Sequence, residues 1–393
     1  MTLLAPCGRP GVPEWRVSLA AKACVAALMI ASACLPSRQA HGTPGVQGAV
    51  AVAGAGAPSG STSATTTLAP GGSSASAPSA ASSAHQAALQ SLLDDAESLA
   101  PLETVIVSQN GQIVAERGYR GHSTTAATNI KSASKLVISA LVGMAIDKNV
   151  LTGTDQRVVD LLKQDLPASP DARMQTLTVG NLLSMQAGLG STSGPQYGAW
   201  VGSRNWVRAA LARPFEDEPG GRMIYSTGST HLLSAILTRA SGRSTLELSR
   251  DWMGPLEGFR ITSWTRDPQG IYMGGNEMAM SPRALLAFGE LYRNGGVTAS
   301  GKRLISESWI DASWQMRTRS PWTGDGQGYA WFLTQIAGED VRYGWGYGGQ
   351  MLYVVPRLNL TVVMTSDAST ASARTGHRND LHRLLGGIIT EIQ

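Results

Sequence analysis

The fold is decided by the stretch 132–146, which reads SASKLVISALVGMAI. Its second part is apolar on nearly all sides, which is typical of a buried helix. Residues three positions apart share one face of a helix, so the Ser132 hydroxyl and the Lys135 amine are expected within hydrogen-bond reach. A desolvated lysine can take the proton of a serine and make it a nucleophile, although the pattern also fits a helix cap with a solvated lysine. At a helix N-terminus the free N–H groups and the dipole also favour an oxyanion.

Strand patterns lie at both ends of the chain, around a helical middle. Residues 104–108 and 112–116, joined by Asn110-Gly111, predict a β-hairpin with a type I′ turn. Further strands are predicted over 329–335, 350–355 and 360–365, and further helices over 178–185, 231–241, 282–294, 307–314 and 377–392. The Gly- and Ser-rich residues 188–206 predict a long surface loop. This order predicts an α/β (α+β) fold with one sheet assembled from both chain ends and an all-α subdomain inserted.

The first 34 residues have the layout of an export signal. Basic Arg16 and Lys22 precede an uncharged stretch, 23–34, that is too short to span a bilayer as a helix. The small residues before Cys34 permit ordinary signal cleavage and equally lipoprotein processing with Cys34 acylated, although Ala31 stands where leucine is usual. We therefore predict an exported, periplasmic protein, attached to a membrane if Cys34 is lipidated.

The rest of the chain divides by composition. Residues 35–83 consist mostly of Ala, Gly, Ser, Pro and Thr, with almost no charge or large apolar side chains. Such a segment cannot bury enough surface to offset its ordering entropy, so it is predicted to be a flexible linker. Residues 84–393 suit one large domain or two interleaved subdomains.

Composition excludes several classes of function. The three cysteines, Cys7, Cys24 and Cys34, all lie in the leader, so no disulfide, thiol nucleophile or thiolate metal site is expected in the folded part. The formal charge of +4 is spread without basic runs, so nucleic acid is not an expected partner. The six histidines include no metal-binding spacing and none that completes a visible Ser-His-Asp triad. We expect neither a metal nor an organic cofactor.

Two further motifs carry chemistry. Residues 219–227, PGGRMIYST, predict a turn and an extended segment that ends before a helix. A tyrosine such as Tyr225, its pKa lowered by a nearby ammonium, can act as base or relay a proton, whereas a core tyrosine is the alternative. Residues 346–350, GYGGQ, directly precede an apolar strand. Paired glycines let a substrate approach the backbone, and the Gln350 N–H would serve as an oxyanion donor beside that of Ser132; a glycine-rich turn is the alternative.

With these three motifs in this order, the chain resembles the serine β-lactamase and penicillin-binding superfamily. It is similar in particular to the class C-like branch, which includes family VIII esterases, D-aminopeptidases and 6-aminohexanoate-dimer hydrolases. Those proteins carry S-x-x-K, then Y-x-N or a variant, then K-T-G or a variant. The resemblance covers residues 102–385 and includes the segments 178–189, 280–283 and 288–296. It implies a β-lactamase/transpeptidase-like fold with an antiparallel sheet flanked by helices.

The resemblance also implies roles for the residues that match. Ser132 would be the acylated nucleophile, Lys135 its proton acceptor and Tyr225 the residue that shuttles the proton to the leaving group. The N–H groups of Ser132 and Gln350 would form the oxyanion hole. The substrate would lie against the remaining motif residues, Thr227, Tyr347, Gly348 and Gly349.

Two departures from the family pattern bear on the substrate. Thr227 stands where many members have asparagine, and Tyr347 stands where members that bind lactams and D-peptides have lysine. Tyr347 has no charge to hold the lactam carboxylate, unless an arginine from elsewhere restores it. We therefore expect an exported serine hydrolase that cleaves small esters or amides. A β-lactamase or D-alanyl carboxypeptidase is the first alternative, and a non-catalytic penicillin-binding-like module is the second.

Overall fold

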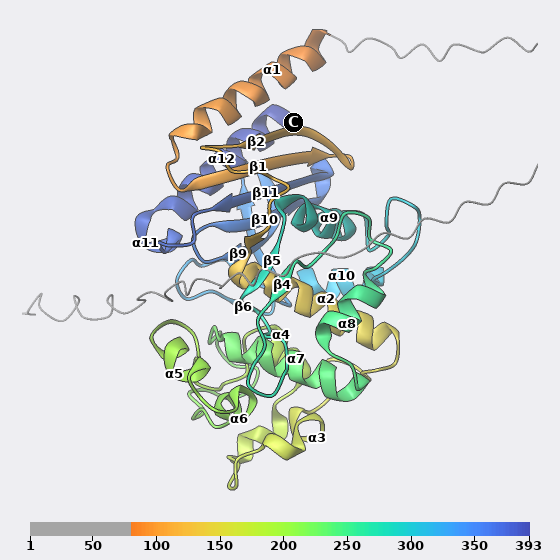
Figure 1. The fold of residues 1–393 in the computed structure, drawn as a ribbon, viewed down its shortest axis with the longest axis vertical. Helices are drawn as coiled ribbons and strands as arrows, with labels where there is room; N and C mark the ends of the chain where they lie inside the picture. Colours follow the sequence, from red (N-terminus) through yellow and green to blue (C-terminus); the bar gives the residue numbers. More distant parts are fainter. Residues whose placement is uncertain (1–79) are drawn as a thin grey trace, which may run out of the picture. The chain divides into compact units, whose positions relative to one another are not determined.

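The computed structural model describes residues 80–393 (Figure 1). The predicted export signal, Cys34 and residues 35–79 of the predicted linker lie outside the described residues. The first described element is α1 (Ala80–Asp95), so helix begins four residues before the predicted start of the folded domain at residue 84. In the part of the chain that the structure describes, no helix is long and apolar enough to cross a membrane.

An antiparallel sheet of eight strands forms the centre of the described part (Figure 1). In spatial order β2 (Gln112–Gly118) and β1 (Leu102–Gln109) are followed by β11 (Leu360–Ser366), β10 (Gln350–Val355), β9 (Glu339–Gly346), β8 (Phe332–Ile336), β7 (Gly326–Gln327) and β6 (Thr318–Arg319). Because β1 pairs with the last strand, β11, the sheet joins both ends of the domain. The predicted fold class is confirmed in this respect.

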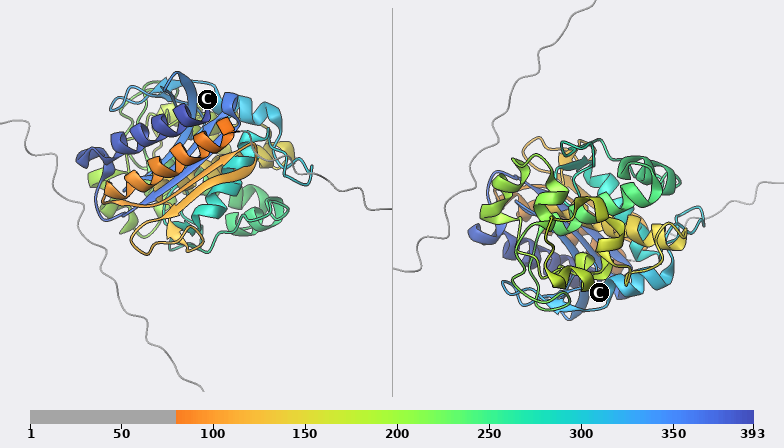
Figure 2. Two further views of the ribbon diagram at one scale, coloured as in Figure 1. Left: turned by 90° about the horizontal axis from the view of Figure 1, so that it is seen from above. Right: turned by 90° about the horizontal axis from the view of Figure 1, so that it is seen from below.

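Helices cover both faces of this sheet. On one face α1 and α12 (His377–Ile392) lie side by side across the strands (Figure 2). On the other face α2 (Lys135–Asp147) and α9 (Pro282–Arg293) pack against the sheet. Successive side chains of a strand point to opposite faces, so Ile106 joins the α2 core while Val105 and Val107 join the α12 core. Every residue of β10 and β11 is buried, as expected for strands covered on both faces.

Helices of 4 to 15 residues make up the inserted subdomain between α2 and β4 (Ser263–Trp264). They are α3 (Val158–Leu161), α4 (Val179–Leu183), α5 (Tyr197–Val201), α6 (Trp206–Leu211), α7 (Thr227–Ser241) and α8 (Thr245–Trp252). A capping box between Thr178 and Asn181 starts α4, and Gly242 at φ 68° ends α7. A second, three-stranded sheet consists of β3 (Thr128–Asn129), β5 (Met278–Met280) and β4, in that order.

The structure confirms some of the local predictions and contradicts others. Asn110 and Gly111 adopt φ of 52° and 81° in a two-residue turn, as a type I′ hairpin requires. The predicted long loop over 188–206 is wrong in part, because it contains a 3₁₀ turn over Gly194–Gln196 and the helix α5. The strand β9 was not expected, since glycines at Gly344 and Gly346 weaken a strand pattern.

Candidate active site

Ser132 lies in the 3₁₀ turn η3 (Lys131–Ser134), directly before α2, and is half-buried. Several hydrogen bonds hold this turn. The Asn129 side chain accepts from Lys131 N at 2.9 Å, Ile130 N donates to the Met278 carbonyl at 2.9 Å, and the Ser134 hydroxyl donates to the Lys131 carbonyl at 2.7 Å. The turn is therefore tied to the small sheet on one side and to α2 on the other. These bonds hold the backbone of the turn that carries Ser132.

The glycines of β9 let the main sheet approach this turn closely. A Cβ at Gly346 would lie 2.3 Å from the Ile130 carbonyl oxygen, and one at Gly344 would lie 2.3 Å from Leu136 Cδ1. No larger residue fits at either position without displacing the backbone or the side chain opposite. The glycines that weaken the strand pattern thus bring β9 against the segment that carries Ser132.

Lys135 is the first residue of α2, and only 3% of it is exposed. Its Nζ donates to the Ser132 hydroxyl at 3.1 Å, to the Thr227 hydroxyl at 3.3 Å and to the Gly275 carbonyl at 2.7 Å. All three acceptors are uncharged, so no carboxylate among them stabilises an ammonium. Burial lowers the pKa of Lys135 to about 7. A lysine in this state is a suitable proton acceptor for the Ser132 hydroxyl.

Tyr225 completes the group around the serine. Its ring centre lies 4.9 Å from Lys135 Nζ, and Ser132 is near enough to its hydroxyl to affect the pKa of Tyr225. Burial raises the pKa of Tyr225 to about 12, an effect larger than the lowering by the neighbouring Ser132. The expectation of a lowered pKa is therefore wrong, because burial of the phenol disfavours its charged form. Tyr225 is a neutral phenol that can relay a proton through its hydroxyl.

A ladder of hydroxyl groups positions Tyr225 and Thr227. Ser193 accepts from Thr227 N at 2.8 Å and lies 3.0 Å from its hydroxyl, while Ser191 donates to the Tyr225 carbonyl at 2.7 Å. Between them, Thr192 bonds Ser226 and Gly228. The consecutive hydroxyl residues 191–193, STS, lie in the segment predicted as a loop, and their pattern was the only sequence signal for this role.

The third motif is arranged differently from the expectation. β9 ends at Gly346, residues 347–349 form the turn, and Gln350 begins β10 opposite Gly346. Gln350 is fully buried, and its side-chain amide donates to the Ser366 carbonyl. Because β10 lies between β9 and β11, the Gln350 N–H points within the sheet and not toward Ser132. The structure does not bring this predicted oxyanion donor to the nucleophile.

Gly348 and Gly349 also have a different reason to be glycine. Their φ angles are 89° and 112°, which other residues rarely adopt. A Cβ at Gly348 would lie 2.5 Å from the Asp367 carbonyl oxygen, and one at Gly349 would lie 2.9 Å from the Ser366 hydroxyl. Close backbone packing against the end of β11 therefore explains both glycines without a substrate. Tyr347 is half-buried at the start of the turn.

Charged and polar groups that the sequence did not single out border the site. Lys131, next to the nucleophile, forms an ion pair with Glu277 at 3.3 Å, and Glu277 also accepts from the Asn129 amide at 2.7 Å. Asn276 donates to the Tyr197 hydroxyl at 2.8 Å, which joins α5 to the segment that carries Gly275. The three segments that supply these residues, 129–131, 197 and 276–277, lie far apart in the sequence and share no motif, so only the fold brings them together.

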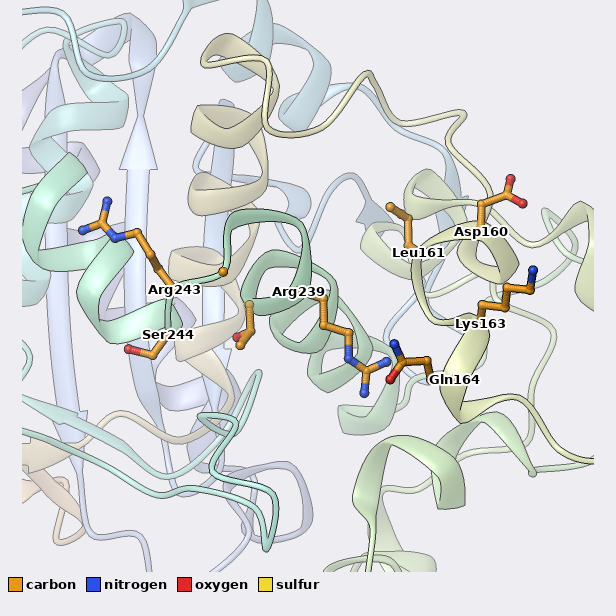
Figure 3. A pocket seen from close by; sticks show the side chains of 9 residues that line it. Asp160, Leu161, Lys163, Gln164, Arg239, Arg243 and Ser244 are labelled. Atoms are coloured by element: carbon orange, nitrogen blue, oxygen red, sulfur yellow. The ribbon is translucent and has the colours of Figure 1, made fainter.

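Two cavities lie elsewhere on the molecule. One of about 440 Å³ is bordered by α3, the end of α7 and the start of α8, with Lys163, Arg239 and Arg243 among its lining side chains (Figure 3). The other, of about 270 Å³, lies behind the turn at Gly348. Neither is lined by Ser132 or Lys135, so the chemistry of the residues and not cavity size locates the candidate site. Among the described residues, no cluster of acidic, His or Cys side chains could hold a metal ion.

Comparison with known proteins places this geometry in a family. The family model described as Beta-lactamase matches residues 97–386, and the chain belongs to this family. Membership of this family supports the conclusion that the protein is a serine hydrolase. In a search of curated proteins, no sequence matches.

Solved structures share the fold at low identity. A putative 6-aminohexanoate-dimer hydrolase from Bacillus anthracis is 19% identical with a TM-score of 0.61, over 76% of this chain and 82% of that one. EstCE1, described as a hydrolase with promiscuous acyltransferase activity, is 18% identical with a TM-score of 0.62, over 79% and 98%. A class C beta lactamase from Rhodobacter sphaeroides is 15% identical with a TM-score of 0.58, over 79% and 99%. The resemblance inferred from the motifs is confirmed.

Proposed function

We propose that this protein is an exported serine hydrolase that cleaves an ester or amide bond through an acyl-enzyme on Ser132. The observation that carries the proposal is the buried Lys135 amine, which lies 3.1 Å from the Ser132 hydroxyl and has its pKa lowered by burial to about 7. Such an amine is partly neutral near pH 7 and can accept the serine proton at the moment of attack. Membership of the Beta-lactamase family supports the same chemistry.

The residues act in two steps. The Ser132 oxygen attacks the substrate carbonyl carbon while its proton passes to Lys135 Nζ, and the carbonyl electron pair moves onto the oxygen. When this oxyanion collapses, the bond to the alcohol or amine breaks, and Tyr225 relays the proton from Lys135 to the leaving group. Water then attacks the acyl-enzyme, gives a proton back along the same path to Ser132, and releases the carboxylic acid.

The oxyanion hole needs a second donor beside the Ser132 N–H, and Tyr347 fits this role better than Gln350. Strand β8 pairs with β9 only as far as Tyr343, so the β9 edge beyond it has no strand partner. The Gly346 carbonyl accepts from Gly349 N at 3.1 Å within the hairpin. Since polar groups of successive strand residues point to opposite edges, the next N–H, that of Tyr347, is directed to the open edge.

The charges at the site favour a substrate without a carboxylate near the reacting bond. Tyr347 stands where lactam-binding members have lysine, and Lys131, the cation next to Ser132, is already paired with Glu277. Hydrolysis of a neutral ester or amide is therefore the first proposal. Action as a β-lactamase or D-alanyl carboxypeptidase remains the alternative, and a non-catalytic binding module is the second.

A substrate panel tests the proposal. The purified protein is offered p-nitrophenyl esters, D-amino-acid amides and nitrocefin, and separately a fluorophosphonate probe followed by peptide mass spectrometry. We expect ester turnover above that of nitrocefin and covalent labelling of Ser132. Rapid nitrocefin hydrolysis without ester turnover would favour the lactamase alternative. Absence of labelling and of all turnover in the folded protein would favour the binding module.

Activity is expected to depend on the protonation of Lys135. Because burial lowers its pKa to about 7, the neutral amine that accepts the proton predominates above that pH. We expect kcat/KM for an ester to rise with pH and to level off above about pH 7. Between about pH 7 and the ordinary lysine pKa of 10.5, the unfolded chain binds more protons at this group, so the Lys135 contribution to stability also increases with pH. A pH profile that is flat from pH 5 to 9 would contradict this role.

Export rests on residues 1–34 alone. We propose that they direct the chain to the periplasm, with either ordinary cleavage or acylation at Cys34. Expression of the full chain in a Gram-negative host and mass spectrometry of the mature N-terminus should show loss of the leader. A lipid mass on Cys34 that disappears in Cys34→Ser would identify a lipoprotein, whereas an intact leader on cytoplasmic protein would refute export.

A further inference from the structure

A buried histidine–aspartate pair contacts the residue next to Gly275, one of the hydrogen-bond acceptors of the Lys135 amine. His231 is on α7, and Asp267 is on the segment that connects β4 to β5 and reaches α7 (Figure 1). Both side chains are fully inaccessible, and His231 Nε2 lies 3.1 Å from Asp267 Oδ2. None of the chemical steps above uses this pair. The burial of an aspartate together with a histidine therefore needs another explanation.

The hydrogen bonds of His231 fix both its orientation and its tautomer. Its Nδ1 accepts from the backbone N–H of Gly274 at 3.3 Å, so the ring proton is on Nε2 and is donated to Asp267. The rings of Trp200 and Trp206 pack edgewise against the imidazole, each with its centre 5.6 Å away. The imidazole thus links Asp267 on one side to the Gly274 backbone on the other.

Asp267 uses its second oxygen to fold the connecting segment. Its Oδ1 accepts from Gln269 N and from Ile271 N, both at 2.8 Å. The Asp267 N–H in turn donates to the Ile271 carbonyl at 2.8 Å. A single carboxylate therefore shapes this turn with one oxygen and anchors it to α7 through His231 with the other.

The segment that Asp267 and His231 hold leads to Gly275, which contacts the proposed proton acceptor, Lys135. A Cβ at Gly274 would lie 2.1 Å from the Thr230 carbonyl oxygen, so its backbone is pressed against α7. The next residue, Gly275, gives Lys135 Nζ its shortest hydrogen bond, at 2.7 Å. His231 also lies one turn after Thr227, the α7 residue whose hydroxyl accepts a hydrogen bond from this amine. The pair thus ties together two of the three acceptors of the Lys135 amine.

We propose that His231 and Asp267 are positioning residues that hold the Gly275 carbonyl against Lys135 Nζ and so aim the amine at Ser132. This inference rests on the proposed function, because it concerns the proton acceptor of that reaction. Without the anchor the carbonyl is free to move, and the amine loses the contact that directs it. Misplacement of a reacting group by about 1 Å can cost about 100-fold in rate. The loss should fall on kcat, since neither side chain reaches the substrate.

Asp267→Asn is the sharpest variant. In this variant the side-chain oxygen of the asparagine still accepts from the two backbone N–H groups, so its NH₂ group faces His231. This NH₂ group is a donor, so His231 Nε2 must be an acceptor. The histidine must then carry its proton on Nδ1, where it opposes the Gly274 N–H. We expect kcat for an ester to fall about 10- to 100-fold with KM nearly unchanged. Nitrogen NMR of the histidine ring should report the change of tautomer, which a purely structural role would not link to kcat.

Three further variants complete the test. His231→Leu removes both hydrogen bonds and should lose at least as much kcat as Asp267→Asn. His231→Asn should recover part of it, because its side-chain oxygen can accept from Gly274. His382→Leu replaces a half-buried histidine of α12, which packs edgewise against the rings of Tyr343 and Tyr353, and controls for loss of packing. Thermal unfolding is measured for each variant, and kcat is calculated per mole of protein that is folded and reacts with the fluorophosphonate probe.

The outcomes separate this inference from the proposed function. If the wild type hydrolyses esters and labels at Ser132, but kcat of folded Asp267→Asn and His231→Leu stays within twofold of it, the pair is structural and the inference is wrong. A rise in KM alone would also overturn it. If the wild type neither labels nor turns over any substrate, the proposed function fails first and the positioning role fails with it.

Discussion

Ser132→Ala is expected to reduce ester turnover by about 10⁴-fold or more, because it removes the oxygen that carries the acyl group in the proposed reaction. The hydroxyl is half-buried beside Lys135 and Tyr225, both of which serve only to move its proton in the proposed reaction. Fold stability should change little, because the substitution removes one oxygen from a turn that other hydrogen bonds hold. Initial rates with p-nitrophenyl esters, together with probe labelling, measure the loss.

Ser134→Ala is a matched control for this variant. Ser134 is two residues further along the same 3₁₀ turn and donates to the Lys131 carbonyl, so its loss tests the effect of loosening the turn alone. We expect Ser134→Ala to keep substantially more activity than Ser132→Ala. Full residual activity in Ser132→Ala would place the nucleophile elsewhere and remove the basis of the proposed mechanism.

Lys135→Met is expected to lower kcat by about 10²- to 10⁴-fold, the range that a general base contributes. Methionine has nearly the shape of the lysine side chain but no amine, so the packing of α2 is kept while the proton acceptor is lost. The residual rate should also lose its dependence on a group with a pKa of about 7. The full pH profile of kcat/KM, from pH 5 to 9, measures both effects.

Lys148→Met provides the comparison for removal of a lysine charge. Lys148 is exposed at the end of α2 and contacts only the face of Trp252 among the described aromatic rings. We expect wild-type kcat and an unaltered pH profile in this variant. If Lys135→Met remained as active as Lys148→Met, Lys135 would not be the base, and Tyr225 would have to be reconsidered for that role.

Much of the fold follows from patterns that are local in the sequence. The hairpin at Asn110-Gly111 requires only two residues that tolerate positive φ between alternating strands. The buried helix α2 follows from an apolar run, and α12 begins and ends at the residues predicted, 377 and 392. The insertion of helices between the two groups of strands was likewise visible in the order of the patterns.

The sequence patterns did not predict elements whose residues are suited to a contact with a distant part of the chain. The alternating glycines of β9 are unfavourable for a strand by propensity, but the fold needs them where η3 and Leu136 approach. The turn at Gly348 and Gly349 was expected as a glycine-rich turn, but its packing against the end of β11 was not. In both cases the reason for the residue lies on another element, so no local pattern contains it.

The stretch 132–146 by itself determined a buried helix with a hydroxyl and an amine on one face, because residues three apart on a helix must be neighbours. Only the tertiary structure decided the state of that amine. Its lowered pKa depends on burial by the surrounding elements, and its direction depends on Thr227 and Gly275, which are 92 and 140 residues away. Desolvation and non-local hydrogen bonds are properties of the folded chain, and they turn a common four-residue pattern into a candidate active site.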